Sequence, residues 1–261
     1  MLAIFHKAFA HPPEELNSPA SQRGPKKPKL PEETLADFIS SHDPTNTFSM
    51  SFGQAAALAY VRPYPAHPLH QLLFCGNDDI YCLFKGSLDN LCMMLKQYGL
   101  SKTANEAMLV SEAYRTLRDR GPYPADQVVK DLEGRFGFII YDSKTGTVFT
   151  ALGSDGGVKL YWGIALDGSV VISDDLEVIK DGCAKSFAPF PTGFMFHSEG
   201  GLMSFEHPMN MVKAVKRVDS QGVICGADFN VDKFTRVNSI PRTGSAMNWT
   251  NWDTHQMHET A

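Results

Sequence analysis

The sequence lacks long hydrophobic runs, a secretion signal and an excess of positive charge. Its apolar stretches are far shorter than the roughly 18 residues that span a bilayer, so we expect no membrane insertion. The first ten residues, MLAIFHKAFA, have neither the basic segment nor the long apolar segment of a secretion signal. The net charge of −5 argues against nucleic-acid binding as the main function. These absences predict a cytoplasmic protein that binds no nucleic acid.

Cysteine is scarce, and no cysteine lies in a CxxC pair. This pattern favours reduced, buried thiols in an intracellular protein. The five cysteines are Cys75, Cys82, Cys92, Cys183 and Cys225. His67 and His70 form an HxxH pair, but they have no third ligand at a clear spacing. We therefore expect no metal and no cofactor.

Two segments lack hydrophobic periodicity. Residues 11–34 are rich in proline and charge, which predicts an exposed, mobile insertion. Their RGPKKPK stretch is either a solvated loop or a nuclear import signal. The stretch from 231 to 261 is polar, and its Trp249 and Trp252 are either placed at random or dock onto a partner or onto the protein itself. We expect one domain over 1–230 and a largely disordered tail.

Strand patterns fall in two groups separated by helical patterns. Predicted strands of the first group lie at 55–62, 71–75 and 80–86, and short alternating strands with hairpin turns recur from residue 135 onward. Helices flanked on both sides by strand groups favour antiparallel sheets over parallel βαβ winding. The pattern therefore predicts an α+β sandwich.

The helices are predicted from apolar stripes and end signals. One helix has Ser87 as its N-cap and stops at Gly99. A second starts with a capping box of Thr103 and Glu106. A short third helix is predicted within 124–134.

Two clusters of charged residues have both a structural and a functional interpretation. The cluster on the second helix consists of Arg115, Arg118, Asp119 and Arg120. Ion pairing or solvation at the helix end is the simpler interpretation, and an anion site is the alternative. Asp174 and Asp175 follow a strand and precede a helix, where capping of that helix is the simpler account.

Five short motifs together resemble the class II glutamine amidotransferase domain of asparagine synthetase. In chain order they are LFKGSLDN (83–90), TANE (103–106), LEGRFGFIIYD (132–142), SDGGVKLYWG (154–163) and FPTG (190–193). Within that superfamily, QYGL (97–100) and LRDR (117–120) resemble the signatures of the plant aluminium-induced proteins with YGL and LRDR motifs. That family name implies a role in stress or hormone responses and does not imply aluminium binding.

The resemblance implies the N-terminal-nucleophile hydrolase fold, a four-layer αββα sandwich of two antiparallel sheets. In that fold the first strand carries the nucleophile. Active members begin Met–Cys, and the α-amino group of the cysteine is its base. This chain has Leu2 in that place. Because leucine is large, we expect Met1 to be retained, and nucleophile and base are then lost together.

Other pocket positions implied by the resemblance also differ from an active enzyme. Lys85 replaces the oxyanion asparagine before Gly86, and Ala104 replaces the acid that holds the glutamine ammonium. The strand 53–60 has no arginine for the glutamine carboxylate, although Arg62 is nearby. We therefore predict no catalytic residue. The vestigial pocket positions are Leu2, Lys85, Gly86, Ala104 and Asp155.

Three functions remain open from the sequence. The favoured hypothesis is a catalytically inactive protein that acts as a homodimer or with another protein partner. The alternative is an active glutamine amidohydrolase or amidotransferase with a modified site. The third is a sensor in which Lys85 and Gly86 hold a small-molecule ligand at the pocket rim. Cys82 and Cys92 lie near Lys85 in the sequence, but core packing is the simpler interpretation of both thiols.

Overall fold

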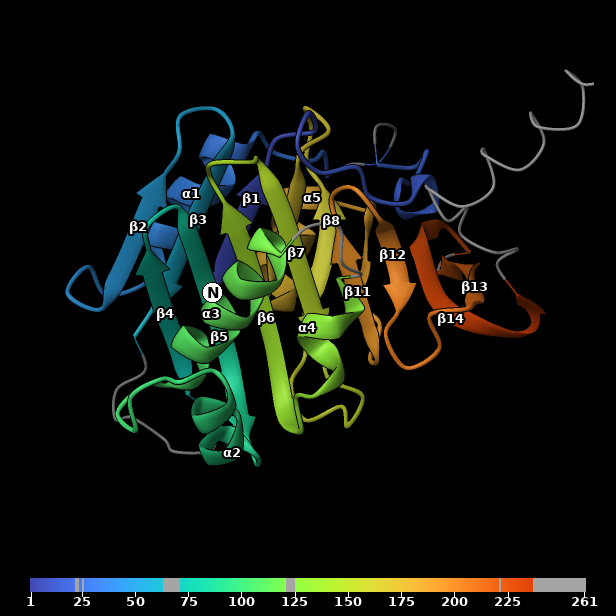
Figure 1. The fold of residues 1–261 in the computed structure, drawn as a ribbon. Coiled ribbons are helices and arrows are strands. Elements are labelled where there is room, and N and C mark those ends of the chain that lie inside the picture. The colour runs from blue at the N-terminus through green and yellow to red at the C-terminus, as the bar shows by residue number, and fades with distance from the viewer. Residues whose placement is uncertain (22–23, 25, 63–70, 121–124, 221, 237–261) are drawn as a thin grey trace, which may run out of the picture.

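The computed structural model describes the whole chain except residues 22–23, 25, 63–70, 121–124, 221 and 237–261. Two six-stranded antiparallel sheets stack face to face (Figure 1). The first, called the β1 sheet, has the order β10 (Phe187–Pro189), β8 (Tyr161–Ile164), β9 (Val170–Ser173), β1 (Leu2–Phe5), β3 (Ala56–Val61) and β2 (Thr47–Ser51). The second, the β6 sheet, has the order β12 (Gly201–Ser204), β11 (Phe194–His197), β7 (Thr147–Leu152), β6 (Gly134–Asp142), β5 (Ile80–Leu88) and β4 (Leu72–Asn77).

The helices cover the outer face of each sheet. Beside the β1 sheet lie α1 (Pro31–Ser40) and α5 (Leu176–Cys183), and beside the β6 sheet lie α2 (Leu91–Gln97), α3 (Glu106–Asp119) and α4 (Asp126–Lys130). A two-stranded ribbon, β13 (Asn210–Val218) and β14 (Ile224–Arg236), follows at one end of the molecule (Figure 1). The predicted four-layer αββα sandwich is confirmed. No helix among the described residues is long and apolar enough to cross a membrane.

Strand β1 illustrates why the sheets are buried on both faces. All four of its residues are buried, and successive side chains point to opposite faces. Ala3 and Phe5 enter the core between the two sheets, while Leu2 and Ile4 enter the core beneath α1 and α5. A strand buried on both sides has a continuous apolar sequence. This explains why LAIF reads as an unbroken hydrophobic run.

The helix starts differ from those predicted. Helix α3 begins at Glu106, and its cap is Asn105, whose side chain accepts the Met108 N–H at 3.0 Å. The predicted cap Thr103 is therefore wrong by two residues. Ser87 lies inside β5, and α2 begins only after Asn90. The predicted third helix is confirmed as α4.

The YGL motif forms the end of α2. Gly99 has a φ of +68°, which glycine adopts without steric cost. The Gly99 N–H bonds to the Lys96 carbonyl at 3.2 Å, and the Leu100 N–H bonds to the Leu95 carbonyl at 2.8 Å. These two bonds are the Schellman motif, and both leucines pack in the core beneath α2 and α3. The predicted stop at Gly99 is confirmed.

Part of the 11–34 segment is buried, so the expectation of an exposed insertion is wrong there. Leu16, in the short 3₁₀ helix η1 (Glu14–Leu16), is fully buried in the core between the sheets. Ser18 is also buried, and its backbone N–H donates to the Ser186 hydroxyl at 2.9 Å. The end of the segment forms the start of α1. A single leucine and a single serine are weak sequence signals among so many prolines and charged residues.

The basic RGPKKPK stretch is engaged with the outer helices of the β1 sheet. Lys26 forms an ion pair with Asp181 of α5, and Lys29 pairs with Asp37 of α1 at 2.5 Å. These contacts favour the loop interpretation over a nuclear import signal.

The ordered structure extends beyond the predicted domain boundary at residue 230. Strand β14 continues through Arg236, and β13 beside it has no counterpart among the predicted strands. The remainder of the predicted tail, including Trp249 and Trp252, lies outside the described residues.

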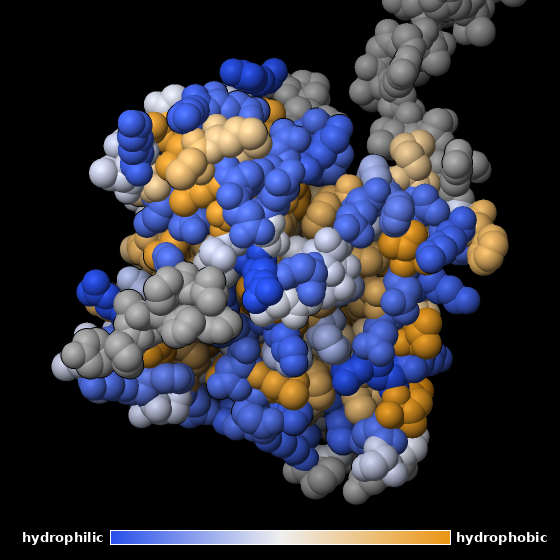
Figure 2. All heavy atoms as spheres, turned by 90° about the horizontal axis from the view of Figure 1, so that it is seen from below, coloured by the Kyte–Doolittle hydropathy of each residue, from blue (hydrophilic) through white to orange (hydrophobic). Residues whose placement is uncertain are grey.

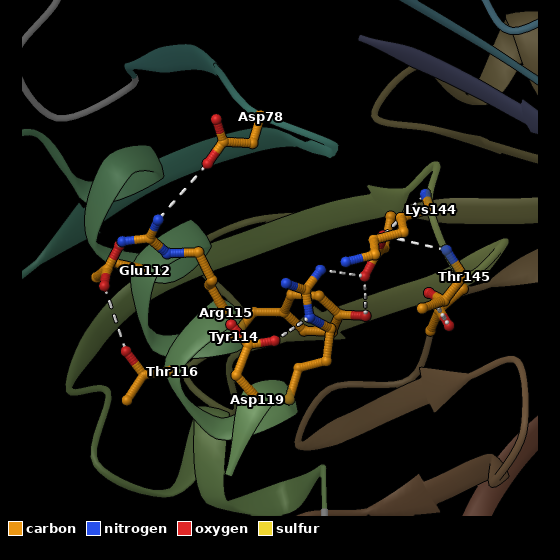
Figure 3. Close-up of polar contacts among 11 residues, drawn as sticks. Asp78, Glu112, Tyr114, Arg115, Thr116, Asp119, Lys144 and Thr145 are labelled. Carbon is orange, nitrogen blue, oxygen red and sulfur yellow. Dashed lines mark hydrogen bonds and ion pairs between the residues drawn. The ribbon is translucent and has the colours of Figure 1, made fainter. Parts of the chain in front are cut away.

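The LRDR motif anchors α3 to the β6 sheet (Figure 3). Arg118 reaches the fully buried Asp142 at the end of β6, with 2.8 Å between nitrogen and oxygen, and the Tyr114 hydroxyl donates to the same carboxylate at 3.2 Å. Arg115 instead pairs at the surface with Glu112 at 2.7 Å. Ion pairing is thus confirmed for Arg115, Arg118 and Asp119 of this cluster.

We expect Arg118→Met to lower the free energy of unfolding by about 3 kcal/mol, because removing one side of a buried pair leaves the other charge stranded. Arg115→Met is the matched control. Its guanidinium is partly exposed and pairs only at the surface, so we expect a loss under about 1 kcal/mol. Urea denaturation at pH 7 measures both values. Equal losses in the two variants would contradict the anchoring role of Arg118.

Candidate site at the amino end of β1

A pocket of about 520 Å³ lies at the amino end of β1. Its walls come from both sheets, from α1 and from the start of α5. The apolar lining residues are Met1, Phe38, Val61, Leu72 and Leu176, and the polar ones are His42, Lys85, Tyr161, Asp174 and Asp175. Its volume lies within the range of small-molecule sites in proteins. The surface seen from below Figure 1 shows hydrophobic side chains in small, separate areas among hydrophilic ones (Figure 2).

Asp174 joins the two sheets at this pocket. One carboxylate oxygen accepts a hydrogen bond from the Met1 amino group at 2.5 Å, and the other accepts one from the Lys85 ammonium at 2.5 Å. Met1 precedes β1, Asp174 follows β9 in the same sheet, and Lys85 lies on β5 in the facing sheet. One carboxylate therefore holds two cations across the gap between the layers.

The environment of Asp174 favours its ionised form. Its side chain is 13% exposed, and this burial opposes ionisation. The charges of the Met1 amino group and of Lys85, together with their hydrogen bonds, outweigh the burial. The pKa of the Asp174 carboxyl is therefore below its usual value. The pocket holds a fixed anion between two fixed cations.

Neighbouring groups fix the position of Asp174. Ser173 donates its hydroxyl to the Met1 carbonyl at 2.8 Å and accepts the Asp175 N–H at 3.1 Å. Asp175 is the N-cap of α5 and accepts the Glu177 N–H at 2.8 Å. The capping interpretation is confirmed for Asp175. Asp174 has a different role, which sequence reasoning missed because its partners are distant in the chain.

Of the five predicted pocket positions, Lys85 alone lines this pocket. Leu2 is fully buried and packs toward α1 and α5 with Phe38. Ala104 is buried on the far side of the β6 sheet, beneath α2 and α3. Asp155 lies in a turn, 3.5 Å from Arg135. The structure thus places Leu2, Ala104 and Asp155 outside the lining of this pocket.

Gly86 has a structural reason to be glycine. Its φ is +113°, and a Cβ at this position would lie 1.9 Å from the carbonyl oxygen of Arg135 on the paired strand β6. The close approach of β5 and β6 therefore requires a residue without a side chain. No role in ligand binding is needed to explain it.

The thiols lie away from the pocket. Cys82 points into the core beneath α3, where burial raises the pKa of its thiol, and Cys92 is exposed on α2. A buried thiol with a raised pKa is a poor nucleophile. Among the described residues, no group of three or more histidine, cysteine or acidic side chains could hold a metal ion. His67 and His70 lie outside the described residues.

Comparisons with known proteins connect this chain first with glutamine-hydrolysing enzymes. A probable glutamine-hydrolysing asparagine synthetase of Dictyostelium discoideum is 40% identical over 74 residues, which are 28% of this chain and 13% of the synthetase. Asparagine synthetase 2 of Oryza sativa is 29% identical over 108 residues, which are 41% and 17% of the two chains. The chain thus spans less than a fifth of either synthetase.

The chain belongs to the aluminium-induced protein family, whose sequence profile matches residues 2–231. It is also 40% identical over 151 residues to the stem-specific protein TSJT1 of Nicotiana tabacum, which covers 58% of this chain and 99% of that protein. Among solved structures, a glutamine phosphoribosylpyrophosphate amidotransferase from B. subtilis is similar with a TM-score of 0.45 and 17% identity, covering 60% of this chain and 36% of the enzyme.

We expect Asp174→Asn to destabilise the protein by about 1–3 kcal/mol at pH 7. The Met1 amino group and the Lys85 ammonium would both lose the carboxylate that neutralises them. The folded-state pKa of Asp174 is lowered, so its ionisation adds stability above pH about 4 that is lost as the pH falls through the folded value. The difference between unaltered and variant protein should therefore shrink in acid. Urea denaturation between pH 7 and 3 measures it.

Asp175→Asn is the matched control for this experiment. Asparagine caps helices as well as aspartate does, so we expect a change of less than about 0.5 kcal/mol. A loss at Asp175 equal to that at Asp174 would show that the double ion pair contributes nothing of its own.

Proposed function

We propose that this protein is a non-catalytic relative of the glutamine-hydrolysing enzymes and acts by binding. One observation carries the proposal. The described residues that line the pocket include no thiol and no serine or threonine hydroxyl. Acyl transfer from glutamine through a covalent intermediate needs such a nucleophile and a base beside it.

The charged groups that are present support binding rather than chemistry. The Met1 amino group and the Lys85 ammonium both donate to Asp174, and an ammonium held by a carboxylate has no lone pair to accept a proton. Leu2 offers only hydrocarbon, and its side chain packs on the helix side of the sheet. The framework motifs, by contrast, retain their structural contacts at Gly99 and Arg118.

We place the protein in the cytoplasm, with access to the nucleus as an open second location, and assign its partner as a protein, foremost a second copy of itself. The names of its relatives, aluminium-induced and stem-specific, support a role in a plant response. In this role the fold provides a binding surface and does not catalyse a reaction.

We expect the purified protein to release no ammonia from glutamine or asparagine above background, while a glutamine-hydrolysing asparagine synthetase assayed alongside does. Leu2→Cys should remain inactive, because the side chain at this position points toward α1 and α5 and not into the pocket. A coupled glutamate and ammonia assay measures all three proteins. Turnover in the unaltered protein that disappears in Lys85→Met would reject the proposal in favour of a modified enzyme.

Ligand binding without turnover is a second candidate, and the pocket itself favours it. Lys85 and Asp174 offer both a cation and an anion to a zwitterion, beside the apolar walls of Phe38 and Leu72. A ligand at 100 times its Kd adds about 2.7 kcal/mol of stability. For a domain of this size that raises Tm by roughly 5 °C or more.

The probes for this second candidate are glutamine, asparagine, glutamate and adenine nucleotides in a thermal-shift experiment. We expect a concentration-dependent rise in Tm with an amino acid for the unaltered protein and none for Lys85→Met. A flat response to every probe removes the candidate and leaves protein–protein binding.

A further inference from the structure

One side of the sandwich ends in two uncharged strands whose outer edges pair with no other strand among the described residues. Strand β2 is the last strand of the β1 sheet, and β4 is the last strand of the β6 sheet, at the same side of the molecule (Figure 1). Their sequences, TFSMS and LLFCGN, contain no charged residue and no proline. Natural proteins usually protect edge strands with charges, prolines or bulges, because a free edge can pair with another chain. Within the described part of the chain, β2 and β4 have neither a charge nor a proline, and no strand pairs with their outer edges.

The core between the sheets is open at this side. Phe48 and Met50 of β2 pair with Tyr60 and Leu58 of β3, and directly opposite residues lie on the same face of a sheet. Leu58 lies in the core between the sheets, so Phe48 and Met50 face inward too. They are nevertheless 48% and 38% exposed. The inner face of β2 thus presents core side chains to solvent.

An aromatic stack links the two sheets at this opening. The Phe48 ring stacks on Tyr60 with 5.2 Å between centroids, and Tyr60 stacks on Phe74 of β4 with 5.5 Å. The stack therefore runs from the edge of one sheet to the edge of the other. Aromatic side chains are enriched where protein interfaces bury their centres. We call the side formed by Phe48, Met50, Tyr60 and Phe74 the aromatic edge.

The sequence of β2 is complementary to itself. Reading outward from Ser49, Phe48 and Met50 are both apolar, and Thr47 and Ser51 both carry hydroxyls. An antiparallel pair of such strands about a two-fold axis at Ser49 places Phe48 opposite Met50 of the second copy and Thr47 opposite Ser51. Apolar contacts then lie on the inner face and hydroxyl pairs on the outer face. Because neither strand is charged, the contact brings no like charges together.

We propose that the aromatic edge is a self-association surface, at which β2 pairs antiparallel with β2 of a second copy, with Ser49 on the two-fold axis. The pairing extends the β1 sheet across both molecules and covers Phe48, Met50 and the stacked rings. This proposal rests on the binding function proposed above and names the surface that performs it. The experiments below measure the mass of the assembly and the strand register, so a negative result is distinct from any result of the glutaminase assay.

The first experiment is sedimentation velocity of the full chain from about 1 to 100 μM. We expect the unaltered protein to reach twice its chain mass of 28.8 kDa. Ser49→Lys places two lysines opposite each other and should raise the dimer Kd about tenfold or more, with the circular dichroism spectrum unchanged because Ser49 is exposed. Ser49→Thr keeps the hydroxyl and should remain dimeric, as should Ser220→Lys at an exposed turn far along the chain. A monomer at 100 μM, or an unaffected dimer in Ser49→Lys, overturns the proposal.

The second experiment tests the register by cross-linking in a Cys92→Ser background, which removes the exposed native thiol. Oxidised glutathione accepts the two electrons as two introduced thiols form one disulfide. Ser49→Cys should give a covalent dimer, since residues opposite each other on antiparallel strands lie within disulfide reach. Ser51→Cys is the control, because its copy would lie roughly 14 Å away along the strands. Equal cross-linking of both variants, or none at Ser49→Cys, overturns the proposed register.

Discussion

Burial of both large sheets on both faces is the constraint on which the remaining structure depends. Each strand near the middle must supply apolar side chains to two cores at once, one between the sheets and one beneath the helices. The consequences are visible in detail. A side chain at Gly86 would collide with the backbone of β6, and Arg118 reaches from α3 to neutralise the fully buried carboxylate of Asp142 at the end of β6. The two family motifs, YGL and LRDR, are parts of this framework.

The same constraint defines the candidate site. At the amino end of β1 the two sheets separate enough to leave a pocket, and polar groups from both sheets meet there. Asp174 is the centre of this meeting point, with a cation from each layer. The Met1 amino group, Lys85 and Asp174 neutralise one another, and these ion pairs connect the two sheets at the pocket.

Much of the fold could be predicted from the sequence, because strand alternation and apolar stripes are local signals. The unbroken apolar runs LAIF and FIIY identify the central strands β1 and β6. Helix starts were less certain, since Thr103 and Asn105 both suit a cap and only the tertiary position of α3 selects Asn105. Strand β2 was missed because TFSMS mixes small hydroxyls with only two apolar residues.

The site itself could not be predicted in the same way. The resemblance identified Lys85, but the partner of Lys85 lies 89 positions away at Asp174, and no local pattern links them. The resemblance implies that Leu2 replaces the nucleophile, but the direction of its side chain depends on the register of β1 between β3 and β9. Side-chain direction at a strand end is set by pairing across the sheet, which a single sequence does not reveal.

The position of β1 also has a consequence for biosynthesis. Leu2 pairs on one side with Ala59 of β3 and on the other side with Ser173 of β9, which is synthesised much later than β3. Pairings this distant in sequence cost loop entropy before they return any contact, and they slow folding. Until residue 173 has been synthesised, β1 can pair only with β3. Completion of the β1 sheet therefore depends on the later half of the chain.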